Sequence, residues 1–272
     1  MLRDICQKSK NARGYFNIIG KHFLKVSKDI AVGIGSFSLF FGNCIRSLVL
    51  GKRYPQKIKE QFMDIGFKSL LLVAITAIFT GGVLALQTYA GCSRFGIETT
   101  VPSVVIISLT RELGPILVGL MVAGRISTSV AAELATMKVT EQLDALQILS
   151  TSPFDFLIVP KIIACTLSLP ILVLIADIIG LLGGTVASIF ALNFELHQYL
   201  LKSFEFLDYS DVVSGLAKSF VFGFIISICG CYYGFNARGG AEGVGRATIS
   251  AIVKSSMFIL LTNYFMTQLF FI

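Results

Sequence analysis

A charged pair, Arg111-Glu112, lies inside an apolar run of the sequence. Ionisable side chains are costly in hydrocarbon, so a pair at this depth indicates a substrate pathway or a polar contact needed for function. Pro115 follows closely and, lacking a backbone donor, opens the hydrogen-bond ladder of a helix at that turn. We expect the pair to line the path of a substrate headgroup or to transmit movement, with a partner on another span such as Asp177. A structural lock between helices is the alternative.

A second segment, Thr140 to Leu149, is short and amphipathic. Thr140 is expected to cap it as a helix, with Glu141 in the first turn, where the helix dipole favours an acid. Its polar face holds Thr140, Glu141, Asp144 and Gln147, and its apolar face holds Val139, Leu143, Leu146 and Leu149. Such a helix between two membrane spans suits docking of a partner protein. The alternative is a surface helix resting on the membrane.

Both segments must be positioned by a membrane-embedded bundle. Hydrophobic residues make up 54% of the 272 residues and charged residues 14%, against about 25% charged residues in soluble domains. The composition predicts an all-α integral membrane protein. Five apolar stretches reach the roughly 20 residues that a span requires: 66–89, 101–123, 156–190 (with Pro160 and Pro170 as possible kinks), 213–235 and 248–272.

The N-terminal part differs from the rest in charge. Thirteen of the 23 Lys and Arg residues lie between Arg3 and Lys68, which indicates a cytoplasmic anchor beside an anionic leaflet. We therefore expect residues 1–60 to form a basic N-terminal segment and residues 61–272 the membrane domain. The interrupted apolar stretch 30–50 is interpreted as an interfacial helix. Nucleic-acid binding is disfavoured, because no module of the known kinds accompanies the charge.

The sequence contains little that indicates catalytic, metal-binding or nucleotide-binding residues. The six cysteines form no CxxC pair, which argues against a metal site. The stretch 240–247 has the glycine spacing of a phosphate loop, but Arg246 and Ala247 stand where Lys and Ser or Thr must grip phosphate and magnesium. We interpret it as a flexible cytoplasmic loop. No hydrolase motif is present, so we expect a membrane subunit without catalytic residues, metal or cofactor.

The run LTRELGPILVGLMVAGRISTSVAAELATMKVTEQLDALQILSTSPFDFLIVPK resembles the MlaE family of ABC-transporter permeases, which serve phospholipid transport systems. The resemblance covers about residue 52 to the C-terminus. It implies five transmembrane helices, an N-terminal interfacial helix and a cytoplasmic coupling helix. Arg111, Glu112 and Pro115 would then belong to the lipid pathway or its conformational coupling. The residues that engage the ATPase would be Glu141, Gln142, Leu143, Asp144 and Leu146.

The partners implied by the resemblance are a second copy of the chain, a cytoplasmic ABC ATPase that holds ATP and magnesium, and an MCE-domain lipid carrier. The expected location is the cell inner membrane, with the N-terminus in the cytoplasm and phospholipid as cargo. The expected role is maintenance of outer-membrane lipid asymmetry. Two other interpretations stay open: a self-sufficient ion-coupled secondary transporter or channel, with Arg111, Glu112 and Asp177 as a relay, and a non-transporting membrane scaffold.

Overall fold

The structure, a computed structural model, describes residue 28 and residues 31–271, and its regular elements there are all helical. Six of these helices are long and apolar enough to cross a membrane, which confirms an all-α integral membrane protein. Their ranges are Ala31–Leu50, Pro55–Phe95, Glu98–Val139, Phe154–Leu192, Tyr209–Phe235 and Gly240–Phe270. The predicted basic anchor before residue 31 lies outside the described residues, Lys28 excepted.

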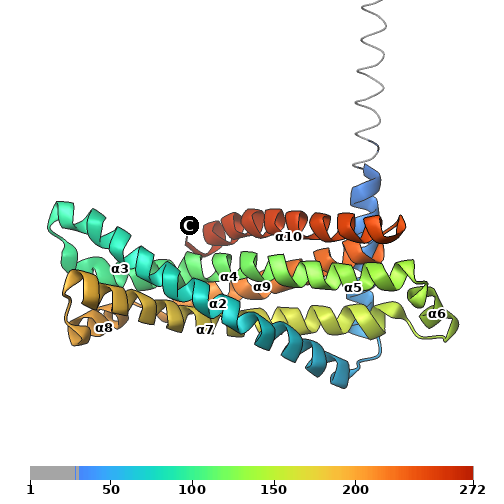
Figure 1. Cartoon of the computed structure of the whole chain (residues 1–272), viewed down its shortest axis with the longest axis horizontal. Coiled ribbons are helices and arrows are strands. Elements are labelled where there is room, and N and C mark those ends of the chain that lie inside the picture. The colour runs from blue at the N-terminus through green and yellow to red at the C-terminus, as the bar shows by residue number, and fades with distance from the viewer. Residues whose placement is uncertain (1–27, 29–30, 272) are drawn as a thin grey trace, which may run out of the picture. The chain divides into compact units, whose positions relative to one another are not determined.

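The chain divides into two compact units, Met1–Val49 and Leu50–Ile272. The helix Ala31–Leu50, of which all but the last residue belongs to the first unit, meets the length and composition of a span, so its interfacial placement stays a prediction. The second unit holds the remaining helices, which run mostly along one direction in Figure 1. They are α2 (Pro55–Cys92), α3 (Val101–Ser108), α4 (Gly114–Val122), α5 (Thr128–Val139), α6 (Gln142–Ile148), α7 (Val159–Leu192), α8 (Leu196–Glu205), α9 (Tyr209–Phe235) and α10 (Gly240–Phe271).

Helices α3, α4 and α5 join into one long span through two π-helical segments, η3 (Leu109–Leu113) and η4 (Ala123–Ser127). A third π segment, η5 (Phe154–Ile158), leads into α7. The second span predicted from the sequence therefore continues to Val139, well beyond residue 123. Because π turns are rare and are frequently found at functional sites, the position of η3 at the charged pair supports a functional role for this segment.

Helix α2 packs against α7 at unusually short range. A Cβ added to Gly81 would meet the backbone of Gly180, and one added to Gly183 would meet the backbone of Ile78. Small residues let membrane helices approach closely, where dispersion contacts and interhelical hydrogen bonds hold them together. The dense glycines of 180–184 thus serve packing inside the bundle.

Two boundaries correct the sequence interpretation. Helix α9 begins at Tyr209 and not at the expected residue 213, because Asp208 and Asp211 form a reciprocal capping box at its start. Helix α10 begins at Gly240, and the stretch 240–247 forms its first turns instead of a flexible loop.

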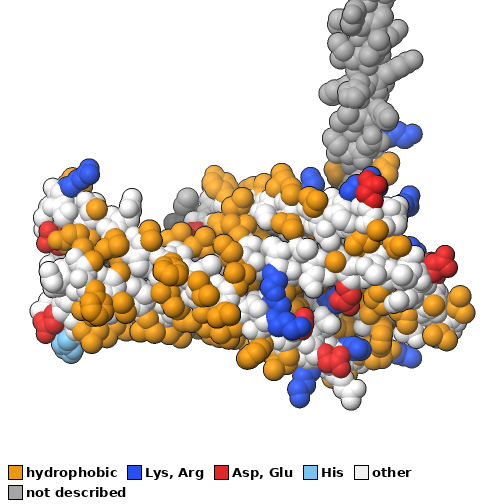
Figure 2. All heavy atoms as spheres, in the orientation of Figure 1, with side chains coloured by type: hydrophobic (Ala, Val, Ile, Leu, Met, Phe, Trp, Pro, Cys, Tyr) orange, Lys and Arg blue, Asp and Glu red, His pale blue; other side chains and the backbone are white. Residues whose placement is uncertain are grey.

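Helices α6 and α8 lie at opposite ends of the second unit (Figure 1). Ser103 of α3 donates to the carbonyl oxygen of Lys202 of α8 at 2.8 Å, and Tyr199 of α8 is fully buried. Burial raises the pKa of the Tyr199 phenol. Figure 2 shows hydrophobic side chains over much of the length between these ends, as expected for a surface that faces lipid.

Candidate functional site

The charged pair lies in η3, inside the first half of the span formed by α3, α4 and α5. Pro115 occupies the first turn of α4 and is buried. Since Pro115 has no N–H, it cannot donate to the carbonyl oxygen of Arg111, four residues earlier. That oxygen accepts a hydrogen bond from the Lys218 ammonium of α9 at 2.9 Å. The carbonyl oxygen that Pro115 leaves without a helical donor, as predicted, therefore binds the charged Lys218 side chain.

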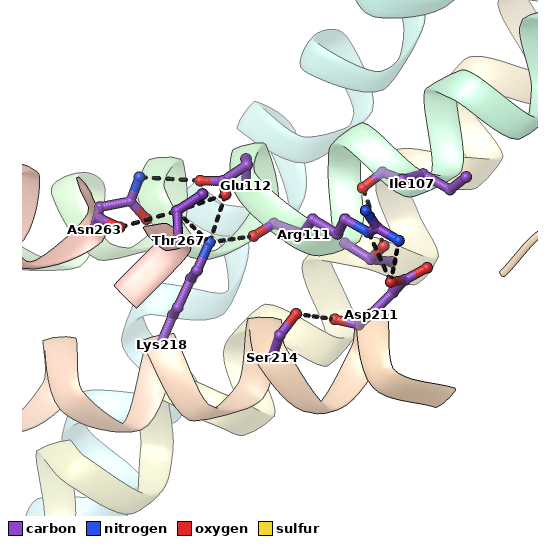
Figure 3. A network of polar contacts seen from close by, with 9 residues as sticks. Ile107, Arg111, Glu112, Asp211, Ser214, Lys218, Asn263 and Thr267 are labelled. Carbon is purple, nitrogen blue, oxygen red and sulfur yellow. Dashed lines mark hydrogen bonds and ion pairs between the residues drawn. The ribbon is translucent and has the colours of Figure 1, made fainter. Parts of the chain in front are cut away.

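The Glu112 carboxylate is held by three side chains from two helices (Figure 3). The Lys218 Nζ atom lies 2.6 Å from Glu112 Oε1, and the Lys218 side chain is fully buried. From α10, Asn263 Nδ2 donates to Glu112 Oε2 at 3.0 Å, and the Thr267 hydroxyl lies 2.7 Å from Oε1. Thr267 also accepts from Lys218 at 2.8 Å. The contacts join η3, α9 and α10 at one point.

Arg111 forms a second ion pair with α9. Its Nε and Nη2 atoms each lie 2.6 Å from Asp211 Oδ1, and the Asp211 side chain is fully buried. The Asp211 carboxylate also accepts from the backbone N–H of Asp208, as part of the capping box. One carboxylate thus fixes the start of α9 and anchors it to η3.

Asp177 contacts neither member of the charged pair, so the partner suggested from the sequence was wrong. The partners are Asp211 and Lys218, both on α9. Their spacing offered a signal, because residues seven apart lie on one face of a helix, two turns apart. That spacing was not used when Asp177 was chosen as the expected partner.

The side chains of Arg111 and Glu112 are 35% and 34% exposed, respectively. The two ion pairs therefore have a buried half on α9 and an accessible half on η3. Charged groups at membrane depth are costly if they face lipid. This face consequently suits a polar substrate group or a covering protein surface.

The predicted coupling segment forms α6, at the end of the unit where charged side chains gather (Figures 1 and 2). Leu143 is buried and Leu146 half-buried, while Glu141, Gln142 and Asp144 are exposed. Lys138 Nζ lies 2.9 Å from Asp144 Oδ1, which ties α6 to α5.

The cap of α6 differs from the expectation. Thr140 ends α5 and its hydroxyl donates to the carbonyl oxygen of Thr136 at 2.9 Å, so it does not cap α6. The residue at the N-cap is Glu141, in the left-handed region with φ of 59°. Leu149, placed with the apolar face, is 73% exposed beside Ile148 at 84%.

A second buried cation, missed in the sequence, lies on α7. Lys161 is 2% exposed; its Nζ atom lies 2.6 Å from Glu133 Oε2 of α5 and donates to Gln61 Oε1 of α2 at 3.2 Å. These contacts fasten α5, which precedes α6, to α7 and α2. Among the described residues, no three His, Cys, Asp or Glu side chains gather closely enough to hold a metal ion.

Comparison with known proteins agrees with this architecture. Residues 58–269 match the family described as Permease MlaE. A probable ABC transporter permease protein of Rickettsia typhi is 51% identical over 255 residues, covering 94% of this chain and 97% of the relative. One from Synechocystis is 40% identical, covering 85% and 88%. The chloroplastic protein TRIGALACTOSYLDIACYLGLYCEROL 1 of Arabidopsis thaliana is 34% identical, covering 90% and 70%. The chain therefore belongs to the MlaE permease family and is a multi-pass membrane permease of the ABC-transporter type.

Proposed function

We propose that this permease moves phospholipid between the inner membrane and a periplasmic MCE-type lipid carrier, driven by a cytoplasmic ATPase, and thereby maintains outer-membrane lipid asymmetry. The observation that carries the proposal is the pair of accessible charges on η3, Arg111 and Glu112, inside a largely apolar bundle. A phospholipid has a charged headgroup and apolar tails, so its path needs apolar walls with a few polar groups. One relative, the Arabidopsis thaliana protein, is named after a lipid, which supports this cargo class.

The same exposure supports a homodimer. About a third of the Arg111 and Glu112 side chains is accessible, although η3 lies within a membrane span. Facing lipid, these charges would be unfavourable. A second copy of the chain that covers this face would enclose them in a cavity between subunits, where a headgroup can reach them.

An ABC permease works with an ATPase subunit, and we propose that α6 is the element that engages it. The helix is short and is anchored to the bundle by Leu143. It presents both acidic and apolar side chains: Glu141, Asp144, Ile148 and Leu149. ATP hydrolysis in the partner would then shift α5 and the joined η3 between two arrangements. The Lys161–Glu133 pair would make α5 move together with α7.

Transfer of a fluorescent phospholipid from proteoliposomes that contain the ATPase complex to its lipid carrier tests the pathway. We expect Glu112→Gln to reduce ATP-dependent transfer at least ten-fold while the ATPase still co-purifies. Glu98→Gln, an exposed acid outside the network, is the matched control. Unchanged transfer with Glu112→Gln would refute the pathway assignment. Transfer driven by an ion gradient without the ATPase would instead establish the ion-coupled transporter.

The coupling assignment has its own test. Replacing Glu141 and Asp144 with Lys should abolish co-purification of the ATPase, because both side chains are exposed on α6. Glu98→Lys makes a charge change of the same sign before α3 and should leave the yield unaffected. Retention of the ATPase at wild-type yield in the α6 variant would contradict the proposed docking site.

A further inference from the structure

Arg125 is a cation in the π segment η4 that takes no part in the ion pairs of α9. Its Nη1 atom donates to the hydroxyl oxygen of Ser69 of α2, and its Nη2 atom donates to the backbone carbonyl oxygen of Asp64 at 3.5 Å. Both acceptors are neutral, and no ion pair within the described part of the chain includes Arg125. The Asp64 carboxylate pairs instead with Lys68. Because a guanidinium carries five N–H donors, Arg125 keeps its charge and several donors for another anion.

The guanidinium can be reached from the surface of the bundle. Arg125 is half-buried, and none of its nitrogens is among the buried polar atoms that lack a partner in the described residues. The preceding residue, Gly124, is exposed, and an added Cβ there would meet nothing within 4 Å. Lys68, which precedes the hydroxyl partner Ser69, has a side chain that is 65% exposed. A ligand can therefore approach Arg125 over an open surface, with a second cation nearby.

The level of Arg125 along the bundle matches one boundary of the hydrocarbon layer. Lys68 is the last charged residue of α2, and the rest of that helix, residues 69–92, contains no Asp, Glu, Lys or Arg. At about 1.5 Å per residue this stretch is roughly 36 Å long, close to the ~30 Å hydrocarbon core of a bilayer. Figure 2 shows basic side chains where the hydrophobic surface of this unit gives way to charged surface. Since Arg125 contacts Ser69, where the uncharged stretch begins, its guanidinium lies at the level of the lipid phosphates.

We propose that Arg125 binds the phosphate of an anionic phospholipid, in the leaflet toward the end of the unit that carries α6 (Figure 1). The planar guanidinium fork suits phosphate oxygens. The two cations Arg125 and Lys68, against the single Asp64 carboxylate, leave a local charge of +1. This excess favours a headgroup whose phosphate charge is not balanced by an ammonium group.

The surroundings of Arg125 suit a lipid that stays in the bilayer. Leu72 of α2 and Met121 of α4, each 39% exposed, lie one turn further into the membrane, where the acyl chains of such a lipid would pack. The bound phosphate would bridge α2 and η4. Arg125 is roughly 20 Å from Arg111 along the span, so this site is separate from the charged network and does not depend on the transport proposed there.

The chain contains no Trp, so a single introduced Trp reports on the lipids beside it. Leu72→Trp places the fluorophore on α2, one turn beyond Ser69. Phe190→Trp, near the opposite end of the unit and at a residue that is 84% exposed, is the reference. The full chain is reconstituted in phosphatidylcholine bilayers that contain increasing fractions of brominated lipid. The brominated lipid is phosphatidylglycerol or phosphatidylcholine with the same chains, so only the headgroup differs.

We expect phosphatidylglycerol to quench Leu72→Trp at about five-fold lower mole fraction than phosphatidylcholine, as one basic residue near the membrane surface provides. The two lipids should quench Phe190→Trp equally. Adding Arg125→Gln should remove the preference at Leu72→Trp, and adding Arg125→Lys, which keeps the charge, should retain part of it. Adding Lys59→Gln, which removes an exposed charge at the same end of α2, should leave the preference intact. Equal quenching of Leu72→Trp by both lipids, or a preference that survives Arg125→Gln, would overturn the proposal.

Two other occupants of this surface would give different results. If neither lipid quenched Leu72→Trp, a protein surface such as a second copy of the chain would cover this face, and the lipid assignment would be wrong. If soluble glycerol phosphate abolished the preference, and sodium chloride at the same ionic strength did not, the ligand would be a free phosphate ester. The headgroup comparison needs no substitution at Arg125, so it decides between these outcomes even if Arg125→Gln does not fold.

Discussion

Loss of the Glu112 charge should destabilise the bundle more than loss of the Lys218 charge. Glu112→Gln leaves the fully buried ammonium with the Arg111 carbonyl and the Thr267 hydroxyl as acceptors, but without the carboxylate charge. Removal of one partner from a buried ion pair costs about 3–5 kcal/mol. Lys218→Met leaves a carboxylate that is 34% exposed and keeps Asn263 and Thr267 as donors. Its cost should be about 1–2 kcal/mol, in the range of a lost hydrogen bond to a charged group.

Unfolding of the purified chain in mixed micelles of SDS and a mild detergent, followed by circular dichroism, measures these free energies. The double variant should cost at least about 2 kcal/mol less than the sum of the single variants, since residues in one network couple. The exposed pair Lys57–Glu60, at 3.1 Å on α2, is the matched control, and its Met and Gln variants should couple by less than about 0.5 kcal/mol. Additive costs, or a Lys218→Met variant as unstable as Glu112→Gln, would refute the reasoning.

Three further predictions use the same unfolding measurement. Gly183→Ala brings a methyl group against the backbone of Ile78 and should lower the free energy of unfolding by about 2 kcal/mol or more. Gly82→Ala is the control, because the nearest neighbours of an added Cβ there are 3.6 Å away. It should change the free energy of unfolding by less than about 0.5 kcal/mol. At the left-handed position Glu141, Asn should be tolerated and Val should cost at least about 1 kcal/mol; equal stability would contradict the cap geometry. Asp211→Asn weakens both a cap and a buried ion pair and should cost about 3 kcal/mol; a cost within experimental error would show that α9 is anchored elsewhere.

The sequence revealed the charged pair and its depth because charge inside an apolar run is visible without a structure. It also placed the amphipathic helix between the second and third long spans, as polar and apolar residues alternate there with helical spacing. The kink residue Pro115 was identified from the same short string. These features depend on neighbours in the sequence, which is why local reasoning found them.

The partners of the charged pair depend on contacts about 100 residues apart, and local reasoning failed there. Hydropathy began the fourth span at residue 213 and left out Asp211, although the cap at Asp208 starts α9 at Tyr209 and so includes it. The spacing of Asp211 and Lys218 matches a helix face, but which face meets η3 is decided by packing. Gly215 contributes to that decision, because an added Cβ there would meet the carbonyl oxygen of Thr110.

The π segment η4 bears on how this chain is compared with distant relatives. A π turn holds one residue more than an α turn. Deleting one residue within Ala123–Ser127 would therefore convert the segment to α-helix, and the faces that α4 and α5 present to their neighbours would stay the same. Gly124 is suited to such a loss, since it is exposed and an added Cβ there would meet nothing within 4 Å. An alignment gap of a single residue at this position is therefore compatible with a conserved architecture, even in the middle of a membrane span.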